Sequence, residues 1–207
     1  MLYSLIIFQI LHALMVIVIL LAVFDVRFRG KWQIDQRSPL LIGIFLPLYT
    51  VGHISVLLFS FSDSINILDW VAFSLTFLAL LIIVKARIDL KHSYAWPGQM
   101  GEKVELVKTG VYAYTRHPLY TGIYLYILGS LISVIYYSDL ILGILMTLVA
   151  AALIVFLSIT AQQEEERLQK DLGGIYVSYK AEVQSTLPLD VLKIRRTSCE
   201  ENDNGEG

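Results

Sequence analysis

Two clusters of polar residues stand at the edges of long apolar runs, and they are the residues of this chain best suited to chemistry. The first spans residues 110–122 and contains Arg116 and His117, just before an apolar run. The second, Glu164 and Glu165, follows the next apolar run. Charged side chains at a lipid boundary are costly unless they line a cavity or bind something. A carboxylate there is well explained if it meets a cation such as a ligand ammonium group, so the pattern predicts a binding site.

Single residues of these clusters also have structural explanations. An arginine at a membrane edge is a common anchor, a proline commonly starts a helix, and three consecutive glutamates are typical of a solvated helix. These explanations do not account for the whole first pattern. In that pattern Gly122, with Gly129 seven positions later, is expected to let another helix approach closely. The pattern reads Gly110-x-Tyr112-x-x-x-Arg116-His117-Pro118-x-Tyr120-x-Gly122.

The composition indicates a membrane protein of one domain. Of the 207 residues, 56% are hydrophobic and only 16% are charged, against roughly 25% in a soluble domain. The formal net charge of −2 leaves no basic excess for nucleic acid. The sequence offers no cluster of metal ligands, and the single cysteine, Cys199, cannot form an internal disulfide.

Five apolar runs are long enough to cross a bilayer, which takes roughly 20 residues. We therefore expect an all-α, polytopic membrane protein with about five transmembrane helices, in contact with the lipid bilayer. Ser138 and Asp139 are expected to cap the fifth helix. The runs cover residues 2–24, 39–61, 67–86, 119–137 and 139–161.

The basic residues are confined to alternate connections between these runs. All 16 Lys and Arg lie in segments 25–38, 85–118 and 162–207. The positive-inside rule places these segments in the cytoplasm. We therefore expect the N-terminus outside, the C-terminus in the cytoplasm, and both polar clusters on the cytoplasmic face.

The C-terminal part divides into a helical segment and a tail. Residues 1–184 are expected to form one membrane-embedded domain, and the polar segment 185–207 a disordered tail whose last part, 198–207, is acidic. Residues 162–184 have helical periodicity, interrupted at Gly173-Gly174, and their apolar face is expected to lie on the membrane or to cap the site. That face consists of Leu168, Leu172, Ile175, Tyr176, Tyr179 and Val183.

Together the two clusters resemble the isoprenylcysteine carboxyl methyltransferase family and its phospholipid methyltransferase relatives. The resemblance covers residues 104–184 and includes the separation of the two motifs by one helical hairpin. Leu172 stands where the family usually has Phe. The matching residues are Leu106-Val107, Gly110, Tyr112, Arg116 to Tyr120, Gly122, Glu164-Glu165, Leu168, Gly173, Tyr176 and Tyr179.

The resemblance implies an S-adenosylmethionine-dependent methyltransferase whose donor binds on the cytoplasmic side. It implies that the backbone near Leu106 and Val107 holds the adenine, and that Glu164 pairs with the donor's ammonium group. Arg116 and Glu165 are the candidate catalytic residues. Methyl transfer from a sulfonium needs alignment and exclusion of water more than a strong acid or base. The remaining candidate donor contacts are Tyr112, His117, Pro118, Leu119 and Tyr120.

Two departures from the family pattern bear on the acceptor. Val104 stands where enzymes that methylate prenylcysteine carboxylates usually have His, and Thr160 stands where they have the Arg expected to hold the carboxylate. A threonine cannot replace a guanidinium as the partner of a buried anion. We therefore expect Thr160 to face a different acceptor: a lipid amine, a thiol or another small amphiphile.

Other functions remain open from the sequence alone. His12 and His53 lie near the middle of two predicted spans, and histidine pairs across helices can ligate haem. Two neutral, hydrogen-bonded histidines are the structural alternative. A non-enzymatic membrane scaffold, or a membrane reductase on a related fold, would also fit the apolar runs, although the chain has no Gly-rich dinucleotide fingerprint.

Overall fold

All the regular secondary structure in the described part of the chain is helical. The computed structural model describes residues 2–23, 37–59, 64–91 and 106–185. Within these ranges it contains no strand, so the predicted all-α class is confirmed. Val104 and the predicted tail lie outside the described residues, apart from Ser185. The helices are α1 (Leu2–Val23), α2 (Arg37–Phe59), α3 (Ile67–Lys91), the 3-10 turn η2 (Gly110–Ala113), α4 (Pro118–Tyr137), α5 (Leu140–Leu172) and α6 (Gly174–Glu182).

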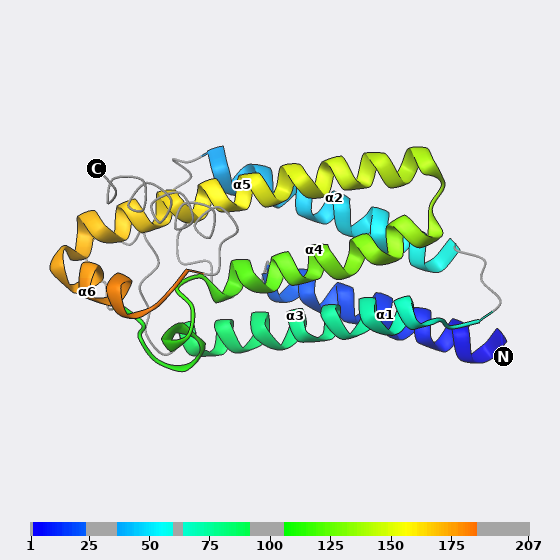
Figure 1. Ribbon diagram of the computed structural model, residues 1–207, viewed down its shortest axis with the longest axis horizontal. Coiled ribbons are helices and arrows are strands. Elements are labelled where there is room, and N and C mark those ends of the chain that lie inside the picture. The colour runs from blue at the N-terminus through cyan, green and yellow to red at the C-terminus, as the bar shows by residue number, and fades with distance from the viewer. Residues whose placement is uncertain (1, 24–36, 60–63, 92–105, 186–207) are drawn as a thin grey trace, which may run out of the picture.

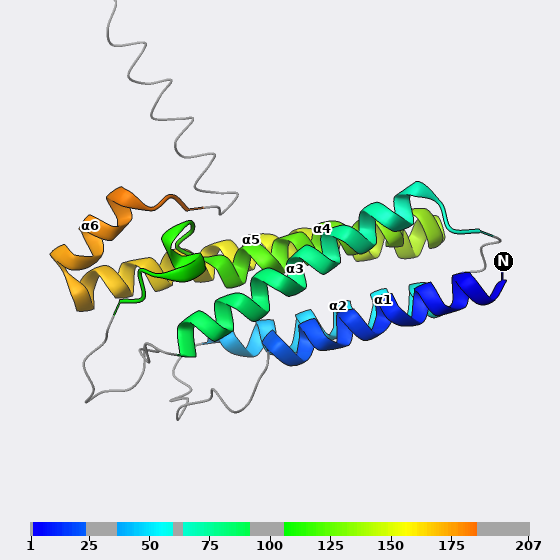
Figure 2. The same ribbon diagram turned by 90° about the horizontal axis from the view of Figure 1, so that it is seen from below.

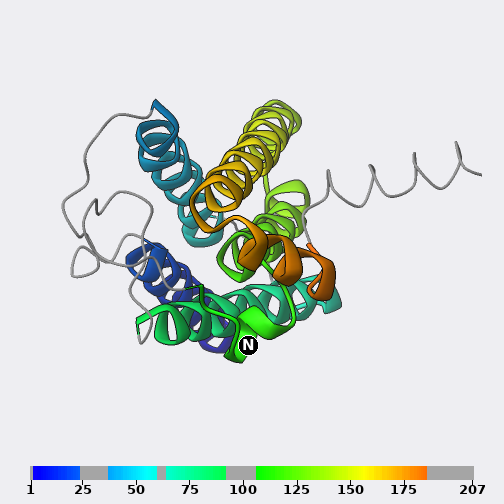
Figure 3. The same cartoon turned by 90° about the vertical axis from the view of Figure 1, so that its left-hand side faces the viewer.

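The five long helices form one bundle, with the two polar motifs at one end of it. Helices α1, α3, α4 and α5 are long and apolar enough to cross a membrane, and Gly43–Phe59 of α2 is a shorter apolar helix packed against α1, α4 and α5. The N-terminus lies at the end of the bundle opposite α6 (Figures 1 and 2). Viewed from the α6 end, α6 lies across η2 and the start of α4 (Figure 3).

Helix α5 joins the fifth predicted span to the first part of the helical segment predicted after it. Asp139 caps its start, with its carboxylate accepting from the backbone N–H groups of Ile141 and Leu142, both at 3.0 Å. The helix then continues past its apolar part to Leu172, where Gly173 ends it with a φ of 54°. The expected break at this glycine is confirmed, and it lets α6 fold back toward the bundle (Figure 2).

The surface of the bundle is apolar where it would face lipid. Leu21, Leu48 and Leu148 are each more than 60% exposed. In water, the exposure of apolar side chains over most of a bundle would be unfavourable. Contact with lipid chains removes that cost. The core between the helices is also apolar and draws residues from α1 to α5, among them Val16, Ile83 and Ile127.

Small residues bring α3 and α4 into close contact, as expected from Gly122 and Gly129. A Cβ at Gly122 would stand 2.5 Å from Ile83 Cγ1, and one at Gly129 would stand 3.0 Å from the carbonyl oxygen of Ala72 on α3. Any side chain here would push the two helices apart. The close approach fixes where α4 begins relative to the end of α3, and so positions the first polar motif.

Polar side chains inside the bundle are paired across helices. His12 Nε2 lies 3.2 Å from Thr76 Oγ1, and the hydroxyl of Tyr126 lies 3.4 Å from His53 Nδ1. The two histidine rings pack edge to face with centroids 5.6 Å apart. Each ring thus meets a hydroxyl group, as the structural alternative of hydrogen-bonded histidines predicts, while His53 Nε2 has no hydrogen-bond partner within the described residues. Such pairs link α1 to α3 and α2 to α4.

We expect Gly129→Ala to destabilise the bundle by about 1–3 kcal/mol, because the added methyl overpacks the contact between α3 and α4. Gly43→Ala is the matched control: it is also a glycine within a helix, and a Cβ there meets no atom within 4 Å. Thermal unfolding in detergent should show a lower midpoint for Gly129→Ala and an unchanged or slightly higher one for Gly43→Ala. Equal midpoints would contradict the proposed role of the glycine contact.

Candidate active site

The first polar motif is held in place by α3. Gly110, which opens η2, has a φ of 64°, and a Cβ there would stand 2.0 Å from Asp89 Oδ2. Only glycine fits both the backbone conformation and the space. The same carboxylate accepts from the backbone N–H of Val111 at 2.8 Å and pairs with Lys85. Asp89 thus anchors the turn that leads to Arg116 and His117.

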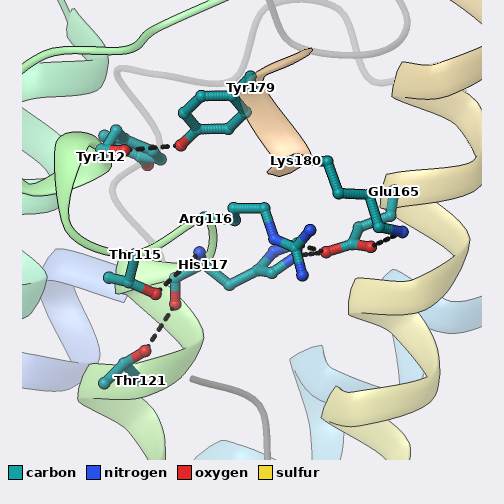
Figure 4. A network of polar contacts seen from close by, with 8 residues as sticks. All are labelled: Tyr112, Thr115, Arg116, His117, Thr121, Glu165, Tyr179 and Lys180. Atoms are coloured by element: carbon teal, nitrogen blue, oxygen red, sulfur yellow. Dashed lines mark hydrogen bonds and ion pairs between the residues drawn. The ribbon is translucent and has the colours of Figure 1, made fainter. Parts of the chain in front are cut away.

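Glu165 is where the two motifs meet. Its Oε1 lies 2.9 Å from His117 Nε2 and 3.2 Å from Arg116 Nε, and its Oε2 lies 2.7 Å from Lys180 Nζ on α6 (Figure 4). The side chains of Glu165, Arg116 and His117 are each at most 8% exposed. One buried carboxylate therefore joins the start of α4, the end of α5 and helix α6.

The partners of Glu165 keep its carboxylate ionised. Burial alone would raise its pKa, but the hydrogen bonds from His117 and Lys180 and the charge of Arg116 outweigh burial and lower the pKa to about 2. The carboxylate is therefore negatively charged at neutral pH and accepts hydrogen bonds through both oxygens.

The neighbouring glutamates have different surroundings. Burial raises the pKa of Glu164, opposed by the charge of His117 and by a hydrogen bond from the Tyr120 hydroxyl. Glu166 is exposed. Positions 164 and 165 therefore face the first motif, whereas position 166 does not. The sequence pattern likewise includes Glu164 and Glu165 and leaves Glu166 out.

Helix α6 covers the site and contributes to it. The hydroxyl of Tyr179 donates to the carbonyl oxygen of Tyr112 at 2.7 Å, which fastens α6 to η2. Tyr176, Tyr179 and Val183 form a small apolar cluster with Leu106, Leu168 and Leu172. Five of the six residues predicted for the apolar face lie in this cluster, and Ile175 is exposed instead.

The remaining predicted site residues lie around this network. Val107 is buried, and Pro118, Leu119 and Tyr120 form the first turn of α4 directly after His117. Thr160 lies on α5 one turn before Glu164, and its hydroxyl donates to the carbonyl oxygen of Phe156 at 2.9 Å. It therefore satisfies its own helix and provides no cation.

Sequence reasoning missed Lys180 as a member of the site. A lysine one position after Tyr179 in a short amphipathic helix has the pattern of a solvated residue, and its side chain is 43% exposed. Only the fold of α6 back over α5 brings its ammonium group to Glu165. Asp89 was also missed, because its role depends on the path of the chain at Gly110.

A comparison with known families agrees with the motifs. The model of the phospholipid methyltransferase family matches residues 67–173, which is more than half of the chain. The matched region contains α3, η2, α4 and α5. It therefore begins further upstream than the resemblance based on the motifs, which covers residues 104–184. No curated protein matches the chain.

Acidification tests the charge of Glu165. Its pKa is lowered to about 2 from an ordinary 4.5, so its contribution to stability is present above about pH 4.5 and is lost as the pH falls toward 2. We expect Glu165→Gln to cost roughly 1.5–3 kcal/mol at neutral pH, and to lose less stability than the wild type on acidification. Unfolding in detergent from neutral pH to about pH 3 measures this.

The control for this experiment is Glu166→Gln, which changes an exposed glutamate one position away. Its unfolding should follow the wild type at every pH. If Glu165→Gln also follows the wild type, the three contacts of Glu165 do not stabilise the fold.

Proposed function

The chain belongs to the phospholipid methyltransferase family, and from this premise we propose that it transfers a methyl group from S-adenosylmethionine to a membrane-partitioned or small hydrophobic acceptor. It is an integral membrane protein by the length and composition of its helices. The observation that supports the proposal best is the meeting of the two motifs at Glu165, which gathers buried charged groups at one end of an apolar bundle.

The residues present fit the proposed donor. The donor supplies an electrophilic methyl group and carries an ammonium group, a carboxylate and an adenine. Glu164 is a half-buried glutamate whose carboxyl group bonds to the Tyr120 hydroxyl, and it suits the ammonium group. The hydroxyl of Tyr176 is buried and has no hydrogen-bond partner within the described residues, as expected for a group that meets a ligand.

The adenine would lie against an apolar wall. Leu106 is half-buried against the cluster on α6, and Val107 is buried beside it. We propose that the backbone of this pair holds the adenine edge, with Tyr112 near. Helix α6 then covers the donor and excludes water, which methyl transfer requires.

The acceptor is proposed to be an amine, a thiol or another small amphiphile. An acceptor carboxylate would need a cation, and Thr160 offers none. Arg116 lies against Glu165 instead. A prenylcysteine carboxylate therefore has no evident partner among the described residues.

We also propose that the site faces the cytoplasm, with the N-terminus outside. All 16 Lys and Arg lie in segments 25–38, 85–118 and 162–207 of the sequence, which the positive-inside rule assigns to the cytoplasm. In a Cys199→Ser background, a cysteine at Ser64 should react with an impermeant thiol reagent in intact cells, and one at Gly101 should not. The reverse pattern would overturn this orientation.

Binding of S-adenosylhomocysteine, the donor's product, tests the donor site. We expect Glu164→Gln to weaken binding by roughly 10- to 150-fold, because a charge-assisted hydrogen bond contributes about 1.5–3 kcal/mol. Glu166→Gln should leave binding nearly unchanged, since Glu166 is exposed. Calorimetric titration of the detergent-purified proteins measures both. Absence of binding by the wild type would refute the proposed donor, and equal binding by Glu164→Gln would refute only the role of Glu164.

A further inference from the structure

Within the described residues, the imidazole of His117 is hydrogen-bonded through one of its two nitrogens. Its Nε2 lies 2.9 Å from Glu165 Oε1, and its backbone N–H donates to Thr115 Oγ1 at 3.4 Å. Nδ1 makes no hydrogen bond within the described residues. It is also not among the fully buried side-chain atoms that lack a partner. The two ring nitrogens therefore have different surroundings.

This asymmetry decides which nitrogen exchanges a proton. Glu165 is a carboxylate at neutral pH, so it can only accept, and Nε2 must donate to it. The hydrogen stays on Nε2 whether the ring is neutral or protonated. Protons enter and leave the ring at Nδ1, the nitrogen that no described group occupies.

We propose that His117 accepts, through Nδ1, the proton that the acceptor must lose during methyl transfer, and that Glu165 is the positioning residue that keeps Nδ1 free for this step. The inference rests on the proposed function. It applies to an acceptor whose nucleophilic atom carries a proton at neutral pH, which is true of an ammonium group or a thiol and not of a carboxylate.

The step balances without another reactant. An ammonium nitrogen has no lone pair, so its proton must first pass to Nδ1. The lone pair then forms the new N–C bond, and the electron pair of the broken C–S bond stays on sulfur, which becomes a neutral thioether. The proton leaves Nδ1 for water after turnover. A thiol reacts in the same way through its S–H group.

Glu165 is itself held in position by Arg116 and Lys180. Arg116 shares Oε1 with His117, and Lys180 occupies Oε2 (Figure 4). The carboxylate thus cannot rotate without breaking a contact to α4 or α6. A carboxylate that fixes the tautomer and orientation of a histidine is a recurrent arrangement in proton transfer. The other groups facing the ring are Tyr120, in ring contact with it, and Glu164.

His117→Gln is the sharpest variant, because the amide can still donate to Glu165 but no longer takes up a proton. With an amine-bearing lipid or a long-chain thiol as acceptor, we expect labelled methyl transfer at neutral pH to fall by roughly 10²- to 10⁴-fold. The loss should shrink by about tenfold for each unit of added pH, since the fraction of free amine or thiolate rises by that factor below the acceptor's own pKa. Transfer to a farnesylcysteine analogue should be negligible for the wild type.

A second measurement does not depend on turnover. The chain has four histidines, and the ¹⁵N resonances of their rings report which nitrogen carries the hydrogen. In the wild type, the resonance that disappears in His117→Gln should show hydrogen on Nε2. In Glu165→Gln, whose amide can donate as well as accept, we expect a mixture of the two tautomers, whereas Glu166→Gln should resemble the wild type.

The outcomes separate this inference from the function on which it rests. A wild type that binds no S-adenosylhomocysteine and methylates no acceptor would defeat the proposed function. Full turnover by His117→Gln at neutral pH, or a loss that does not shrink as the pH rises, would overturn the proton-accepting role and leave the methyltransferase intact. A loss of turnover matched by an equal loss of S-adenosylhomocysteine binding would make His117 a binding residue only.

Discussion

The buried carboxylate of Glu165 is the interaction on which the arrangement of the site depends. Three cationic or hydrogen-bonding groups from two other elements converge on it: Arg116 and His117 at the start of α4, and Lys180 on α6. A buried carboxylate is tolerated only if both of its oxygens are satisfied. Moving any one of these elements would leave a charge without its partner, so the contacts hold the three in a single arrangement.

The bundle provides the geometry that makes this convergence possible. Gly122 and Gly129 let α4 approach α3, and Asp89 at the end of α3 then holds η2 just before Arg116. These are constraints of space and backbone conformation rather than of hydrophobicity, since lipid chains are as apolar as the core. Packing inside the membrane therefore sets the positions of polar groups outside it.

Most of the fold and part of the site could be predicted from the sequence. Apolar runs and helix-ending signals located the long helices, because bilayer thickness and helix rise leave little freedom. The fifth span and the helical segment after it were predicted separately, and they form one continuous helix, α5; the contacts of its polar last turns with His117 and with α6 depend on the fold and could not be predicted from the sequence. Lys180 could not be found from the sequence, because its spacing is that of a solvated lysine and its partner lies on another helix.

Under the proposed function, the position of the site would let a single chain serve a polar donor and an apolar acceptor. Tyr120 belongs to the apolar core, while its hydroxyl bonds to Glu164 at the polar end. Ala161, one turn before Glu165, is fully buried in the same core. The charged network thus begins within one helical turn of the lipid-embedded core. Under the proposed function, a donor entering from water and an acceptor arriving from the bilayer need to meet only at this boundary, and neither has to cross the environment of the other.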